Sequence, residues 1–109
     1  MALTTNTKSQ ISGVANHTVG RVVADAGAAA LTTFNAGFIP RVVRWHNLTD
    51  RISDEWFEGM AADSSLHTVA AGTRTLAVSG AIIVGTDGTF TIDAGLIVAS
   101  KTFAWEALG

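Results

Sequence analysis

Short apolar segments separated by turns that contain Gly or Asp fill the second half of the chain, and this alternation most constrains the fold. Turns recur about every 8 to 12 residues, which is typical of antiparallel sandwiches and jelly-roll-like barrels. No stretch shows the apolar period of a long amphipathic helix, so a helical or doubly wound fold is not expected. We therefore predict an all-β protein, an antiparallel β-sandwich or jelly-roll-like barrel with an extended N-terminal arm.

Residues 38–48 are the clearest predicted strand of the first half, because β-branched and aromatic side chains dominate them. The alternation places Ile39, Val43 and Trp45 on one face of this strand. A turn rich in Asn and Asp follows, since these side chains bond readily to nearby backbone N–H groups. A second predicted strand at 52–60 would then pair with the first one as an antiparallel hairpin.

The strongest hairpin signal of the chain is Asp87-Gly88, which lies between two apolar segments. A type I′ turn at this place would need positive φ at both residues. The continuous apolar run at 81–84 predicts a strand that is covered on both faces. Residues 61–66 are predicted as a loop or one short helical turn and Ser79–Gly80 as a turn. Residues 11–24 are predicted as one or two strands, and the loop after them enters a strand at 31–34. The remaining strands are predicted at 67–70, 73–78, 90–92, 96–98 and 102–108.

The domain organisation follows from the length of 109 residues, which suits one domain. Residues 13–109 are predicted to form a single β-sandwich domain. Residues 1–12 are polar and Thr-rich without a clear period, and we expect them to form a flexible or partner-bound arm.

The composition excludes several classes of function. The net charge is −2 and the few Lys and Arg residues are scattered, so no basic stripe for nucleic acid is expected. The chain contains no Cys, no apolar run long enough for a membrane span and no secretory signal, so we expect it to be cytoplasmic when synthesised. The hydrophobic content of 48% with only 15% charged residues favours an oligomer that covers apolar surface.

Carboxylates gather at one place only, as Asp50, Asp54, Glu55 and Glu58. A glycosidase would need two of them across a cleft, but strand alternation turns Glu55 away from Asp54 and Glu58. Arg44 lies nearby in the sequence, and we expect cross-strand ion pairs. The spacing also matches no calcium-binding loop.

The remaining polar residues give no enzymatic motif. His17, His46 and His67 lie far apart in the sequence, and no Gly-x-Ser-x-Gly segment marks a nucleophile. We expect no catalytic residue, no cofactor and no metal site, and hence no enzyme.

Three tryptophans, Trp45, Trp56 and Trp105, could form a platform that stacks on sugar rings. Each one lies inside an alternating strand, which favours packing in the core or at a subunit interface. Tyr is absent, although sugar-binding loop surfaces usually use it heavily.

A resemblance is visible in an ordered set of segments, the longest of which runs from Gly37 to Arg51. The others are Glu55-Trp-Phe-Glu-Gly-Met60, Thr68-Val-Ala-Ala-Gly-Thr-Arg-Thr-Leu76 and Ala99-Ser-Lys-Thr-Phe103. The set resembles small β-rich virion structural proteins of tailed bacteriophages, of the capsid decoration (cement) type, which are encoded beside the major capsid protein. The likeness covers residues 37–108.

The resemblance implies a protein that binds the outer surface of the phage head and stabilises it, with the major capsid protein as partner. It implies a homo-oligomer, a trimer, and a location on the head exterior of the virion. Candidate residues for core or trimer packing are Trp45, Trp56, Phe57 and Trp105. Candidate capsid contacts in the arm are Leu3, Thr4, Thr5, Lys8 and Ile11. The alternative from another class is a carbohydrate- or cell-surface-binding module on a head fibre or tail.

Overall fold

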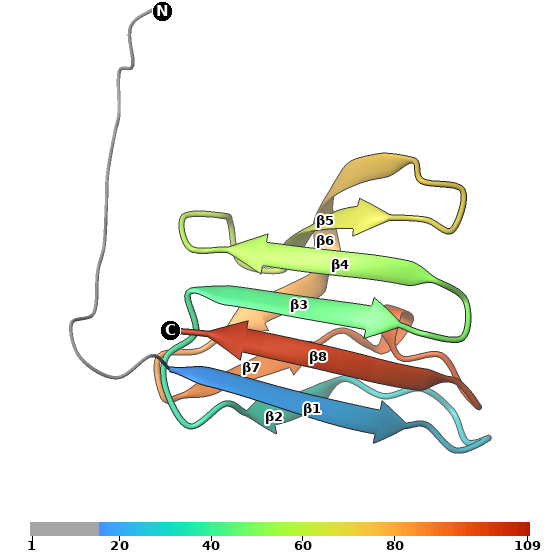
Figure 1. Ribbon diagram of the computed structural model, residues 1–109, viewed down its shortest axis with the longest axis horizontal. Coiled ribbons are helices and arrows are strands. Elements are labelled where there is room, and N and C mark those ends of the chain that lie inside the picture. The colour runs from blue at the N-terminus through green and yellow to red at the C-terminus, as the bar shows by residue number, and fades with distance from the viewer. Residues whose placement is uncertain (1–15) are drawn as a thin grey trace, which may run out of the picture.

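Eight antiparallel strands form one continuous sheet in the computed structural model, which describes residues 16–109 (Figure 1). The strand order is β1-β8-β3-β4-β5-β6-β7-β2. The arm candidates Leu3, Thr4, Thr5, Lys8 and Ile11, and the predicted boundary at residue 13, lie outside the described residues. The strands are β1 (His17–Val23), β2 (Thr32–Asn35), β3 (Val42–Asn47), β4 (Ile52–Phe57), β5 (Ser64–Thr68), β6 (Arg74–Val84), β7 (Thr89–Ile92) and β8 (Thr102–Leu108).

The sheet curls into a half-barrel because β6 belongs to both of its layers. Residues 74–77 of β6 pair with β5, and Ile83 and Val84 pair with β7. Ile82 pairs with both strands. Figure 1 shows the result, with β7 and β2 lying behind the layer that β1, β8, β3 and β4 form. The prediction of an all-β antiparallel fold is confirmed, in its barrel-like form.

The core lies inside this curl, where the two layers face each other. The strands β3 and β8 alternate strictly between buried and partly buried residues, as their sequence pattern predicts. Phe34 of β2 packs against Trp45 of β3 and Trp105 of β8, with ring centroids 5.4 and 6.0 Å apart, so the two layers are in direct contact. The largest fully buried apolar side chains are Trp45, Phe90, Phe103, Ile82, Ile92 and Val43.

The predicted hairpin of the first half is confirmed, since β3 pairs with β4 and Arg44 lies opposite Glu55. The predicted position of Ile39 is wrong. Ile39 precedes β3 and is 57% exposed, because β3 begins only at Val42, after Pro40. Proline supplies no ladder hydrogen bond, so the strand starts beyond it.

The hairpin at Asp87-Gly88 is confirmed, but its predicted turn type is wrong. Only Gly88 has positive φ, at 89°, and the N–H of Gly85 donates to the carbonyl oxygen of Thr89 at 2.9 Å. This arrangement matches a three-residue hairpin loop that ends in a left-handed Gly. The prediction that 81–84 is covered on both faces is also wrong for Ile83, which is 37% exposed.

Two further predictions of local structure are wrong. The expected turn at Ser79–Gly80 lies within β6, which passes through a register shift there and continues into the second layer. The expected strand at 96–98 is replaced by a 3₁₀ turn, η1 (Ala94–Leu96). Asp93 causes this turn, because its side chain accepts a hydrogen bond from the N–H of Gly95 and so caps the turn.

The segment predicted as a loop at 61–66 is shorter in the structure, since β5 begins at Ser64. No helix among the described residues is long and apolar enough to cross a membrane.

Candidate functional site

All three tryptophans are buried. Trp45 is 1% exposed, Trp105 8% and Trp56 9%. The ring of Trp45 stacks on Phe103 with centroids 5.0 Å apart, and its Nε1 donates to the carbonyl oxygen of Leu96 at 3.1 Å. These tryptophans therefore belong to the core, and they offer no exposed platform for a sugar ring.

Phe57 lies on the opposite face of β4 from Trp56, as the alternation requires. It is half-buried, and the guanidinium carbon of Arg44 lies 5.9 Å from the centre of its ring. The backbone N–H of Phe57 donates to the sulfur of Met60 at 3.2 Å. Phe57 thus supports the outer surface of the sheet and is not part of the aromatic core.

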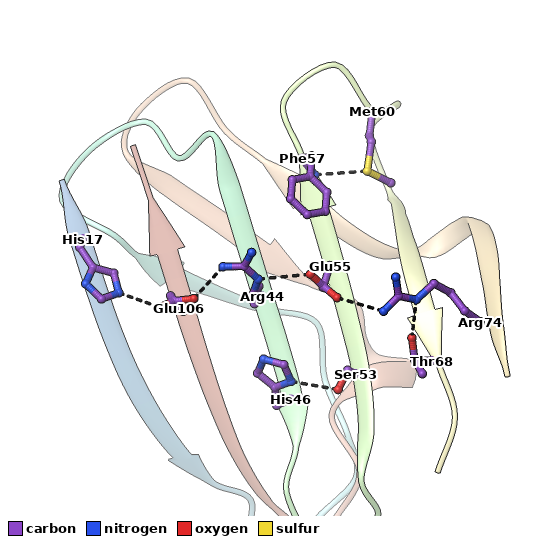
Figure 2. Close-up of polar contacts among 10 residues, drawn as sticks. All are labelled: His17, Arg44, His46, Ser53, Glu55, Phe57, Met60, Thr68, Arg74 and Glu106. Atoms are coloured by element: carbon purple, nitrogen blue, oxygen red, sulfur yellow. Dashed lines mark hydrogen bonds and ion pairs between the residues drawn. The ribbon is translucent and has the colours of Figure 1, made fainter. Parts of the chain in front are cut away.

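A row of charged side chains crosses this outer face from β1 to β6 (Figure 2). His17 Nε2 lies 2.8 Å from Glu106 Oε2, and Arg44 Nη1 donates to Glu106 Oε1 at 2.9 Å. Arg44 Nε donates to Glu55 at 3.2 Å, and Arg74 lies 3.7 Å from the other oxygen of Glu55. We call these five residues the outer ion row. They confirm the expected cross-strand pairing of Arg44.

The charges of the outer ion row reinforce one another. Hydrogen bonds from Arg44 and then from His17 hold the pKa of Glu106 below its usual range. Hydrogen bonds to Glu106 and then to Glu55 raise the pKa of Arg44. Because these side chains are 19% to 57% exposed, each pair stabilises the fold by only about 0.2 to 1 kcal/mol. The outer ion row therefore fixes the positions of these side chains on the outer face of the sheet more than it stabilises the fold.

A buried carboxylate lies on the inner side of β4. Asp54 is 2% exposed, and its Oδ1 accepts a hydrogen bond from Ser65 Oγ at 2.8 Å. His67 Nδ1 lies 2.8 Å from the same oxygen. A Ser-His-Asp triad needs the serine hydroxyl to bond to the imidazole, whereas here serine and histidine both bond to the carboxylate. The cluster ties β4 to β5 and does not activate the serine.

The acidic residues of the sequence cluster do not meet at one cleft. Asp50 bonds to Asn47 and lies 3.3 Å from Lys101, and Glu58 lies 3.7 Å from Arg41. Within residues 16–109, no group of three His, Cys, Asp or Glu side chains could hold a metal ion. The described carboxylates are therefore structural partners of nearby cations and donors.

A hollow of the described surface lies where β1 ends and the chain turns toward β2. Its volume is about 270 Å³, and Ala residues from 28 to 30, Val22, Ile97 and Asp25 contribute to its lining. The Asp25 carboxylate accepts a hydrogen bond from the N–H of Gly27 at 2.8 Å, so it shapes its own loop. Small apolar side chains and one engaged carboxylate do not form a catalytic constellation.

The edges of the sheet are the surfaces that remain open. Among the described residues, β1 pairs only with β8, and β2 pairs only with β7. Large apolar side chains are exposed on β1 and on the outer part of β6, with Val19 68%, Val23 67%, Leu76 60% and Val78 77% exposed. These edges and apolar side chains are therefore the exposed, unpaired surfaces of the described part of the chain.

Comparisons with protein-family models, curated proteins and solved structures found no match for this chain.

Two residues that the sequence analysis did not single out are central to the geometry. Asp63 accepts hydrogen bonds from the N–H groups of Gly80 and Ala81, where β6 crosses between the layers. Gly20 of β1 lies opposite Trp105 of β8, whose indole covers it. Neither role has a sequence signal, because each depends on a neighbour far away in the chain.

We expect Gly20→Ala to destabilise the protein by about 1 to 3 kcal/mol, because a Cβ atom there would overlap the indole of Trp105. Urea unfolding of both proteins measures the difference. Trp105→Phe removes the indole atoms that this Cβ would overlap. The double variant Gly20→Ala with Trp105→Phe should therefore lose less free energy of unfolding than the two single variants lose in sum. Strictly additive losses would show that the overlap is not the cause.

Proposed function

We propose that this chain is a non-enzymatic structural protein of a phage virion, a capsid decoration protein that binds the outside of the head and stabilises it. Its partner is the major capsid protein, and its location is the head exterior. The observation that carries the proposal is the division of the molecule into a sealed aromatic core and open sheet edges. Such a molecule acts through its surface.

The sealed core supports a binding role over catalysis. On the inner side, Ser65 and His67 both bond to the carboxylate of Asp54, and the charged side chains of the outer face pair across strands. A stapling protein needs a rigid scaffold of this kind, since it gains affinity from many repeated contacts around a shell. An extended arm or a free edge strand would supply those contacts.

The alternative, a sugar-binding module on a head fibre or tail, finds less support. It requires an exposed aromatic face, and none of the three tryptophans is more than 9% exposed. We therefore do not propose it.

Deletion of residues 2–12 is expected to abolish co-sedimentation with expanded capsids assembled from the neighbouring major capsid protein. The midpoint of urea unfolding should stay unchanged, because the described core begins after this segment. A matched control replaces residues 2–12 by a Gly/Ser segment of equal length, which should also fail to bind if the arm residues make the contacts. If the chain without residues 2–12 still bound capsids, the proposed role of the arm would be overturned. If the full chain did not bind, the proposed decoration role would be overturned.

Copies of the chain are also proposed to associate with one another. The resemblance implies three copies. An edge strand such as β1, which can pair with the same strand of a second copy about a two-fold axis, favours two.

A further inference from the structure

The strand β1 is the longer of the two edge strands of the described sheet, and its protection against pairing is limited to the charge of Arg21. It is seven residues long, it contains no Pro, and its register with β8 is continuous from His17 to Val23. Natural proteins shorten, bulge or charge such edges, because an exposed flat edge recruits another strand. The opposite edge, β2, follows this rule with only four residues.

The outward backbone groups of β1 follow from its pairing with β8. The N–H of Ala24 donates to the carbonyl oxygen of Lys101 at 3.0 Å, and the N–H of Gly109 to that of Asn16 at 3.0 Å. Antiparallel strands alternate between bonded and non-bonded pairs, so the residues with even numbers between Asn16 and Ala24 bond to β8. The N–H and C=O groups of the odd-numbered residues point away from the sheet, namely those of His17, Val19, Arg21 and Val23.

The side chains of the same four residues lie on the outer face and are exposed. Val19 and Val23 are 68% and 67% exposed. Arg21 has no ion pair with a described residue. The edge therefore offers outward backbone groups, two β-branched side chains and one unpaired cation.

We propose that a second copy of this chain binds at this edge, with its β1 antiparallel to the first β1 about a two-fold axis. In the matching register, Val19 lies opposite Arg21 of the second copy, and His17 lies opposite Val23. This register pairs every outward group of both strands, and the two half-barrels share one continuous sheet. Such isologous pairs are the commonest symmetric association.

Charge complementarity selects this register. Glu106 is the neighbour of Val19 on β8, and Arg44 is the neighbour of Glu106 on β3. Arg21 of the second copy, which lies opposite Val19, is therefore next but one to Glu106 across the shared sheet. Its guanidinium extends the outer ion row by one cation. A shift by two residues in one direction would place the two Arg21 side chains opposite each other, and like charges directly opposite destabilise a sheet. A shift in the other direction would place Arg21 opposite His17 of the second copy, whose neighbour on β8 is Leu108, and so move it away from Glu106.

This inference rests on β1 and does not depend on the proposed function. A single strand pair is a small interface, so the dimer should form and dissociate with concentration in the micromolar range. Two-fold pairing at β1 gives an even number of copies.

The first test is the mass of the full chain by size-exclusion chromatography with light scattering over a range of concentrations. Twice the chain mass of 11.3 kDa at high concentration is the expected result. A monomer at all concentrations, or a trimer, would overturn the proposal.

Val19→Pro is the decisive variant, because proline removes an outward N–H that the fold of one copy does not use. It should shift the protein to a monomer, with its circular dichroism spectrum unchanged. The matched control is Thr33→Pro, which removes an outward N–H from β2 at the other edge and should leave the dimer intact. A dimer that persists in Val19→Pro would overturn the proposal.

Hydrogen exchange on the unmodified protein keeps the test decisive even if a proline variant fails to fold. The amides of His17, Val19, Arg21 and Val23 should gain protection as the concentration rises, whereas the outward amide of Thr33 should not. Exchange at β1 that does not depend on concentration would overturn the proposal.

Discussion

Replacing Trp45 by Ala is expected to lower the free energy of unfolding by about 3 to 5 kcal/mol, the usual range for an aromatic side chain in a packed core. Trp45 is 1% exposed, and it contacts Phe103 of β8 and Phe34 of β2. Its removal leaves a cavity between the two layers of the sheet. It also leaves the carbonyl oxygen of Leu96 without its donor.

Urea unfolding followed by fluorescence and by circular dichroism measures this loss. Val78→Ala is a suitable control, because Val78 is 77% exposed and such surface changes usually stay within about 0.5 kcal/mol. If Trp45→Ala cost no more than the control, the tryptophan would not be a core residue.

The second large effect is expected for Asp63→Ala, which should lower the free energy of unfolding by at least about 3 kcal/mol. The carboxylate accepts from Gly80 N–H at 3.0 Å and from Ala81 N–H at 2.9 Å. Ala81 is fully buried, so water cannot easily replace the lost acceptor. Hydrogen bonds to a charged group contribute about 1.5 to 3 kcal/mol each, and a buried donor left alone adds its own desolvation cost.

Asp63 also has positive φ, at 63°, so an Ala variant combines loss of the carboxylate with backbone strain. Asp63→Gly separates the two effects, because Gly tolerates this conformation. We expect Asp63→Gly to lose about 1 kcal/mol less than Asp63→Ala and still to be clearly destabilised in urea. Wild-type stability of Asp63→Gly would show that the carboxylate does not hold the crossing of β6.

A dimer through β1 would also affect how the proposed arms reach a capsid. The described chain begins at Asn16, directly before β1. In an antiparallel pair of β1 strands, the two N-terminal segments start from opposite ends of the shared edge. Seven residues of strand separate these points by about 20 Å. Two arms so placed would contact two neighbouring sites on a shell and gain affinity by avidity.

Some features of the site could be predicted from the sequence, because they depend on neighbours along the chain. Arg44 and Glu55 lie on two strands joined by a short turn, so alternation and hairpin geometry predict their pairing. Burial of the three tryptophans followed in the same way from their places in alternating strands. The bond of Asp54 to Ser65 and His67 could not be predicted, because β5 lies beyond a loop whose length sets the register.

Local sequence patterns predict the all-β class, the hairpins at β3–β4 and β6–β7, and the inward face of β3 at Val43 and Trp45. Each of these follows from side-chain period and turn chemistry, which act over a few residues. The passage of β6 through Gly80 into a second layer depends on a distant contact, since the carboxylate of Asp63 accepts hydrogen bonds from the N–H groups of Gly80 and Ala81. The place of β1 at the edge of the described sheet likewise depends on distant segments, because β8 reaches β1 from the far end of the chain.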